Sequence, residues 1–134
     1  MTAIIIGIVS GILAVLVIQL LKLNNKPVIY GQILTGIGFL YVGFTWTDTP
    51  SLIITCIQAL CFMFLAYAGV RSNINLLIAG YFLHGIWDFG YHFFTGSELI
   101  PPHYDLFCLS IDFTMGAFLI LIRNTLVKKM KPAS

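Results

Sequence analysis

Charged side chains are scarce in this sequence of 134 residues, of which Lys, Arg, Asp and Glu together make up 9%. A soluble domain carries about 25% charged residues, so the composition excludes a soluble enzyme and a nucleic-acid-binding protein. A disordered segment is excluded as well, because 59% of the residues are hydrophobic. With a mean hydropathy of +0.97, the chain is expected to be a single domain, residues 1–134, that lies almost wholly within a membrane and meets its lipid.

Cysteine is sparse too, and the three cysteines form no Cys-x-x-Cys pair. The absence of that pair excludes a disulfide-exchange enzyme. Cys56 and Cys61 are five residues apart, so they point to different faces of a helix. We expect both to be small hydrophobic residues in a buried core.

Five apolar segments are long enough to cross a bilayer as helices, which takes about 20 residues each. These segments are residues 3–23, 29–46, 52–70, 74–94 and 106–127. A strand of a membrane barrel needs only about 9–11 residues of alternating polarity, so helices are favoured. The expected fold class is all-α, an integral membrane bundle of five transmembrane helices.

The basic residues all fall on one side of this five-helix topology. They are Lys22, Lys26, Arg71, Arg123, Lys128, Lys129 and Lys131. The five acidic residues lie on the other side, or in the half of the membrane that faces it. By the positive-inside rule the C-terminus is expected in the cytoplasm and the N-terminus outside.

One connection is long, residues 95–105 on the outer side, and it contains the pair Pro101 and Pro102. Two consecutive prolines end any helix there. The segment is either a lid over the outer mouth of the bundle or a simple linker, and the sequence leaves both open.

Polar residues form a stripe on each of the last two predicted helices. His84, Asp88 and His92 are spaced by four, which puts them on one side of a helix. Asp105, Cys108 and Asp112 are spaced by three and four, which also puts them on one side. Ionisable residues within a membrane usually face the bundle interior, so the two stripes are expected to face each other. At about 1.5 Å per residue, Asp88 and Asp112 both lie about 9 Å below the outer surface.

These residues predict a polar pocket in the outer half of the membrane, with His84 as its floor. The candidate catalytic residues are His84, Asp88, His92 and Asp112. The candidate substrate-binding residues are Tyr41, Gln58, Trp87, Tyr91 and Cys108.

Two carboxyl groups at one depth in a low dielectric do not both ionise easily, and a neighbouring histidine can hold the proton. That arrangement suits general acid–base chemistry, as in an isomerase, cyclase or hydrolase of a lipid or an isoprenoid-like apolar molecule. A proton-coupled transporter or proton conductor needs the same groups, although polar residues are sparse in the inner half. In the plainest alternative these side chains only hydrogen-bond and hold the helices together.

A metal site is a further alternative, which would make the protein a metal- or haem-binding membrane subunit. The candidate ligands are Asp88 and His92 with Asp112 or Cys108, or else His84 with Asp88 and Asp112. Such ligands suit zinc or iron, although the sequence contains no His-Glu-x-x-His motif. No cofactor is required by the sequence, and no motif specifies a homo-oligomer.

The segment from His84 to Asp112 resembles an uncharacterised bacterial family of small multi-span membrane proteins. Members carry His-x-x-Trp-Asp and a histidine pair, then a Gly/Pro-rich loop and Cys-x-x-x-Asp. The residues that match are His84, Trp87, Asp88, His92, Gly96, Pro101, Cys108 and Asp112, with Tyr91 in place of the first histidine of the pair. The resemblance implies a multi-pass protein of the bacterial inner (cytoplasmic) membrane. It does not indicate which activity the protein has. His84 and Asp88 are also similar in spacing to the His-x-x-x-carboxylate pair of emopamil-binding-type sterol isomerases.

Overall fold

A computed structural model describes residues 1–94 and 97–130, and all of the regular structure in it is helical. The long helices are α1 (Thr2–Leu20), α2 (Lys26–Thr45), α3 (Thr49–Arg71), α4 (Ile74–Phe94) and α5 (Tyr104–Met130), with a short 3₁₀ helix, η1 (Ser97–Leu99). The prediction of five long helices is confirmed, and their bounds differ by up to three residues from the predicted ones.

The helix starts were predicted about three residues late at α2 and α3, where a proline lies inside the first turn. Pro27 and Pro50 occupy this position, and proline suits it because its φ is already helical and its missing N–H needs no partner there. Asp48 caps α3 by accepting a hydrogen bond of 3.0 Å from the Ser51 N–H. Hydrogen bonding from the Ser51 side chain, together with this backbone hydrogen bond, stabilises the charged form and lowers the pKa of the Asp48 carboxyl.

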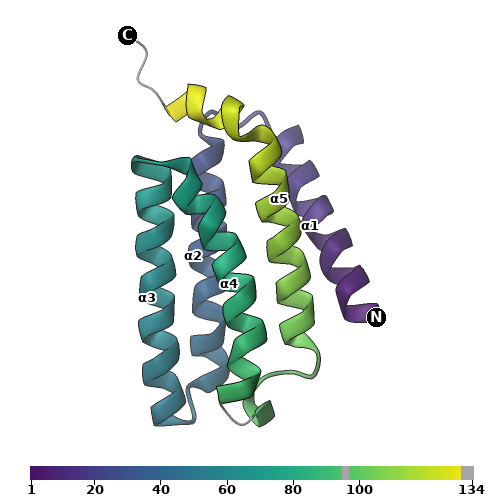
Figure 1. The fold of residues 1–134 in the computed structure, drawn as a ribbon, viewed down its shortest axis with the longest axis vertical. Coiled ribbons are helices and arrows are strands. Elements are labelled where there is room, and N and C mark those ends of the chain that lie inside the picture. The colour runs from purple at the N-terminus through teal and green to yellow at the C-terminus, as the bar shows by residue number, and fades with distance from the viewer. Residues whose placement is uncertain (95–96, 131–134) are drawn as a thin grey trace.

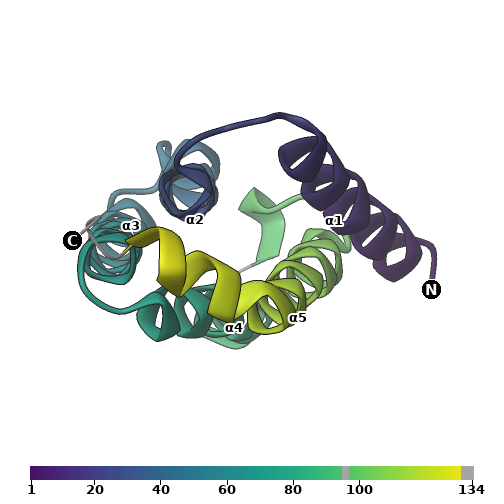
Figure 2. The same cartoon turned by 90° about the horizontal axis from the view of Figure 1, so that it is seen from above.

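Helices that follow each other in the sequence run antiparallel, but they do not pack in sequence order, and the neighbours α1 and α5 run parallel (Figure 1). α1 packs mainly against α5, α5 against α4, α4 against α3, and α3 against α2. Seen from above, they form an arc whose two end helices, α1 and α2, are neighbours in the sequence (Figure 2). The helix nearest the middle of this arc is α4, which also contacts α2.

The two ends of the bundle differ in charge. The α1–α2 loop, the α3–α4 turn and the C-terminal end of α5 lie together at the upper end in Figure 1. We call this the basic end, because Lys26, Arg71 and Lys128 lie in these segments. The opposite end holds the α2–α3 turn, with Asp48, and η1, with Glu98. The predicted sorting of charges between the two ends is therefore present in three dimensions.

Among the described residues, α1, α2, α3 and α5 are long and apolar enough to cross a membrane. α4 has a comparable length of 21 residues, but His84, Asp88 and His92 make it more polar. Most of the outward surface of α1 is apolar, as at Ile5 and Leu13, which are 59% and 61% exposed. Cys61 is also exposed, so the expectation that it is buried was wrong. Lipid tails are as apolar as a protein core, so a hydrophobic residue need not be buried in such a bundle.

Small residues set the closest helix contacts. α1 meets α5 at the buried residues Gly7 and Gly11, and a Cβ atom on Gly7 would lie 2.6 Å from the Phe107 carbonyl oxygen. At the α3–α4 corner, a Cβ atom on Gly69 would lie 2.5 Å from the backbone nitrogen of Leu77. Because the backbone of Leu77 belongs to a helix, it has little freedom to move away.

Gly69→Ala is therefore expected to destabilise the bundle by about 1–3 kcal/mol, the usual effect of overpacking. The measurement is the free energy of unfolding in mixed detergent micelles. Gly36→Ala is the matched control, because a Cβ atom there has nothing within 4 Å; it should be neutral or stabilise by up to about 1 kcal/mol. Equal stability of the two variants would contradict the close contact at Gly69.

Candidate functional site

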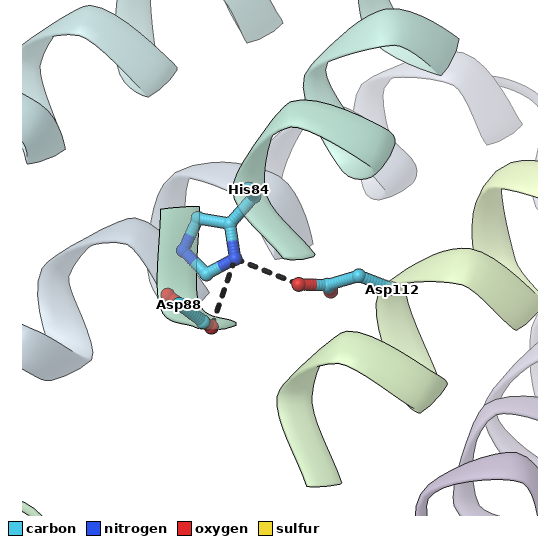
Figure 3. Close-up of side chains that lie close together, drawn as sticks. All are labelled: His84, Asp88 and Asp112. Atoms are coloured by element: carbon cyan, nitrogen blue, oxygen red, sulfur yellow. Dashed lines mark hydrogen bonds and ion pairs between the residues drawn. The ribbon is translucent and has the colours of Figure 1, made fainter. Parts of the chain in front are cut away.

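Three ionisable side chains from α4 and α5 meet inside the bundle (Figure 3). Nδ1 of His84 lies 2.7 Å from Oδ2 of Asp112 and 3.4 Å from Oδ2 of Asp88. The side chains of His84, Asp88 and Asp112 are 1%, 0% and 2% exposed. We call these three residues the His–Asp cluster. The predicted facing of the two polar stripes is confirmed for its members.

Local packing explains why α5 comes close enough to α4 at this level. Gly85 follows His84, and a Cβ atom there would lie 3.3 Å from the Cβ of Asp112 and 3.2 Å from the Phe113 ring. A larger residue would therefore push Asp112 away from His84. On the other side, the Phe62 ring of α3 packs edge-on against the His84 ring, with 4.8 Å between the ring centroids. The imidazole is thus held between an apolar ring and a carboxylate.

The His–Asp cluster contains two carboxyl groups but only one basic group. In the described part of the chain, His84 is the only ion-pair partner of either carboxyl group. Apart from the nearby Cys108 thiol, which is a weak donor, the described residues give neither oxygen of Asp88 a hydrogen-bond donor. Buried charges are stable only when they are paired or bound to a metal. Two carboxylates and one imidazole therefore need a bound proton or a cation to balance their charge.

Asp88 also lines a cavity of about 390 Å³ at the end of the bundle opposite the basic end. The other lining residues are Tyr41, Tyr91, His92, Ile100, Pro101, Pro102, His103, Asp105 and Leu106. Ile100, Pro101, Pro102, His103 and Asp105 belong to the long connection, so this segment forms part of the cavity wall. His103 has a positive φ of 61°, which is uncommon for a residue other than glycine and turns the chain from the proline pair into α5.

His92 does not join the His–Asp cluster. It is exposed, lies at the cavity wall and packs against the Phe93 ring. Each step of four residues turns about 40° around a helix, so His92 is displaced by about 80° from His84. The expected metal ligand sets that contain His92 are therefore not assembled. The set of His84, Asp88 and Asp112 is assembled, with one ligand atom of each residue within 4.8 Å of the others.

The predicted substrate-binding residues divide into two groups. Tyr41 and Tyr91 line the cavity and contact each other, with 5.1 Å between their ring centroids. Cys108 is buried beside Asp88. Trp87 packs on Tyr91, and Gln58 is buried in α3 with no hydrogen bond from its amide among the described residues. Neither Trp87 nor Gln58 lines the cavity.

The sequence analysis missed Tyr104 and Tyr81. The Tyr104 ring stacks edge-on against Phe44, with 5.0 Å between the ring centroids, and lies 6.0 Å from the Tyr41 ring. Tyr81 is fully buried. It precedes His84 by three residues and therefore shares the polar stripe of α4, a signal that the sequence did contain.

Tyr81 belongs to a polar chain that leads toward the basic end. Its hydroxyl donates to the Tyr30 carbonyl oxygen at 2.7 Å. Gln19 Nε2 donates to the Tyr30 hydroxyl at 3.3 Å, and Lys26 Nζ donates to Gln19 Oε1 at 2.6 Å. Polar residues are few in this half of the bundle, as expected, but hydrogen bonds connect these four residues.

Comparison with known proteins gives one result. The model of a family of unknown function, DUF6010, matches residues 2–125. This range contains the whole His–Asp cluster, and the match agrees with the expected resemblance to an uncharacterised family. No curated protein and no solved structure matches the chain.

The geometry of the His–Asp cluster predicts a strong pairwise interaction. A double-mutant cycle of His84→Ala and Asp112→Ala should give a coupling energy of about 1.5–3 kcal/mol, as for hydrogen bonds to charged groups. Polar pairs between membrane helices average about 0.6 kcal/mol. The measurement is the free energy of unfolding of the wild type, both single variants and the double variant.

The matched control is the neutral, buried pair of Thr45 and Thr55, whose hydroxyl oxygens also lie 2.7 Å apart between two helices. A cycle of Thr45→Val and Thr55→Val should give a coupling energy near the average of about 0.6 kcal/mol. Similar coupling energies for the two pairs would mean that His84 and Asp112 do no more than hold helices together.

Proposed function

The chain belongs to the DUF6010 family, whose function is unknown, and we propose that it is an acid–base enzyme embedded in a membrane. The observation that carries the proposal is that Asp88 lies between the cavity and His84. It lines the cavity, and it lies 3.4 Å from a histidine that is itself hydrogen-bonded to a second carboxyl group. General acid–base catalysis needs such a group, within reach of a substrate on one side and of a proton acceptor on the other.

The proposal gives each member of the His–Asp cluster one task. Asp88 exchanges a proton with a substrate in the cavity, since it is the only member that lines this space. His84 accepts or returns that proton at Nδ1, and the Asp112 carboxylate orients the ring and stabilises its charged form. His92 is a cavity residue in this scheme and takes no part in proton transfer. An isomerase, a cyclase and a hydrolase are all compatible with these tasks.

The cavity supports a substrate with an apolar body. Its volume of about 390 Å³ lies within the usual range of about 300–1,000 Å³ for small-molecule sites. Its walls combine the rings of Tyr41 and Tyr91 with Ile100 and Leu106. A lipid or isoprenoid-like molecule suits these walls, with the reacting atom at Asp88.

The proposal includes a membrane position for all five helices. α4 has 21 residues, which reach about 30 Å at about 1.5 Å per residue and so match the apolar thickness of a bilayer. It packs along both α3 and α5, two helices that are apolar enough to span. By the positive-inside rule the basic end faces the cytoplasm, with the N-terminus outside. The resemblance to bacterial membrane proteins favours the inner membrane.

Asp88→Asn should abolish the chemistry and leave the fold intact. Asparagine has the same shape but cannot exchange the proton, and losing an acid–base group lowers a rate by about 10²–10⁴-fold. The measurement is mass spectrometry of lipids extracted from membranes that contain the overproduced protein, incubated in D₂O. We expect one lipid or isoprenoid class to be converted or to gain deuterium with the wild type and not with Asp88→Asn.

Glu98→Gln is the control, because Glu98 is exposed and lies outside both the cavity lining and the His–Asp cluster. It should behave as the wild type does. Lipid profiles that are the same with the wild type, with Asp88→Asn and without the protein would refute the enzyme.

Proton conduction is a second candidate, which the hydrogen-bonded chain of Tyr81, Tyr30, Gln19 and Lys26 favours. Two breaks weigh against it. Tyr81 donates to a backbone carbonyl oxygen, which cannot pass a proton on. No hydrogen bond joins Tyr81 to Asp112 within residues 1–94 and 97–130, although the two groups interact electrostatically. The enzyme is therefore the better-supported proposal.

Liposomes that contain the wild-type protein should accordingly show the same proton permeability as protein-free liposomes. The measurement is the decay of an imposed pH gradient, followed with an entrapped fluorescent dye. A decay at least ten times faster than in protein-free liposomes, and lost in Asp88→Asn, would establish conduction instead.

A further inference from the structure

We propose that His84, Asp88 and Asp112 bind one divalent transition-metal ion, with zinc as the favoured metal. The inference rests on the proposed function in one respect, because the metal ion would be bound by the same three residues to which we assign the acid–base chemistry. Metal binding itself is independent of any substrate and can be measured without one.

The distances within the His–Asp cluster suit a small metal ion. Zinc binds nitrogen and oxygen ligands at about 2.0–2.2 Å, so tetrahedral ligand atoms lie about 3.3 Å apart. Nδ1 of His84 lies 3.4 Å from Oδ2 of Asp88, which already matches that separation. The distance of 2.7 Å from Nδ1 to Oδ2 of Asp112 would have to widen by about 0.6 Å. All three ligand atoms lie within 4.8 Å of one another, so rotations of the side chains would have to bring the two carboxyl oxygens to the same separation.

The charges of the cluster call for a cation. Every Lys and Arg in the sequence lies toward the basic end or in the C-terminal segment, and none of those in the described residues pairs with Asp88 or Asp112. A divalent ion would balance the two carboxylates at once, as buried carboxylates usually require. Asp88 gives the independent observation, because it is 0% exposed and no N–H or O–H group of the described residues forms a hydrogen bond with its carboxyl oxygens. The nearest nitrogen, Nδ1 of His84 at 3.4 Å, is already hydrogen-bonded to Asp112.

The arrangement resembles a catalytic metal site more than a structural one. Structural zinc sites have four protein ligands, whereas catalytic sites have three and an open position for water or substrate. The cluster supplies three ligands, and the cavity beside Asp88 is the side from which an ion and its fourth ligand would enter. A water molecule on such an ion becomes acidic near neutral pH. One imidazole and two carboxylates suit zinc, iron or manganese and exclude a soft-metal site.

The test is the metal content of the full-length protein, purified in detergent with an affinity tag free of histidine. Inductively coupled plasma mass spectrometry should find about one transition-metal ion per chain. After treatment with a chelator, the wild type should take up about one Zn²⁺ per chain when excess metal is removed by gel filtration. Asp88→Asn and Asp112→Asn should each take up less than about a tenth of the wild-type amount, since loss of even an outer contact weakens metal binding by about 10–100-fold.

Two variants serve as controls and should keep the wild-type stoichiometry. Glu98→Gln removes a carboxyl group far from the cluster, and His92→Asn removes the histidine of the alternative ligand set. Loss of zinc in His92→Asn, with zinc retained in Asp112→Asn, would overturn the assignment to His84, Asp88 and Asp112.

The wild type decides the question even if the Asn variants fail to fold. A wild-type protein that purifies without a transition metal and takes up less than about a tenth of an equivalent of Zn²⁺ overturns the inference. The same preparation loaded with Co²⁺ should show visible absorption that added Zn²⁺ abolishes. A lack of this absorption would also count against the metal site.

If the wild type binds no metal but still converts a lipid in an Asp88-dependent way, the metal site is refuted and the proposed enzymatic activity stands. If the wild type binds zinc and converts no lipid, the metal site stands and the proposed enzymatic activity is refuted.

Discussion

The hydrogen bond between His84 and Asp112 joins the two helices on which the candidate site is built, and the other features of the site are arranged around it. It is short, at 2.7 Å, and both side chains are almost completely buried. An interaction of this kind is strong because its surroundings are apolar, and for the same reason its loss leaves a costly unpaired group. Asp88 adds a second carboxyl group to this pair. The charge that results has to be balanced inside the protein, and this requirement is what the proposed acid–base and metal-binding roles rest on.

The close approach of the helices makes that interaction possible. Gly85 lets α5 pack tightly beside His84, and Gly7 and Gly11 let α1 pack against the other side of α5. In the membrane position proposed above, apolar side chains would gain little by leaving lipid, so small residues and polar pairs would hold the helices together where a water-soluble protein relies on its hydrophobic core. The glycines and the His–Asp cluster thus act together, because the glycines allow the short distance between helices at which the cluster can form.

The polar groups differ between the two halves of the bundle. Toward the end with Asp48 and η1 they converge on a cavity that residues 100–103 help to line. Toward the basic end they form a narrow chain, in which Tyr81 and Gln19 donate to Tyr30, and Lys26 donates to Gln19. A cavity that opens at one end, together with a chain that a backbone carbonyl interrupts, suits a reaction at the end with the cavity better than passage across the membrane.

The sequence by itself determined the helices and the identity of the polar layer. Apolar segments of about 20 residues predict helices, because a helix satisfies its backbone hydrogen bonds within one segment. A spacing of four residues put His84 and Asp88 on one side of a helix. The same spacing wrongly included His92, because a spacing of four drifts by about 40° per step and the deviation grows along the helix. Only the tertiary structure decided that Asp112 meets His84, that residues 100–103 line a cavity at Asp88, and that Tyr81 reaches Tyr30. These contacts depend on how far each helix is rotated toward its neighbours and on the path of a proline-containing connection. Both are results of packing between distant segments, which no local pattern in the chain encodes.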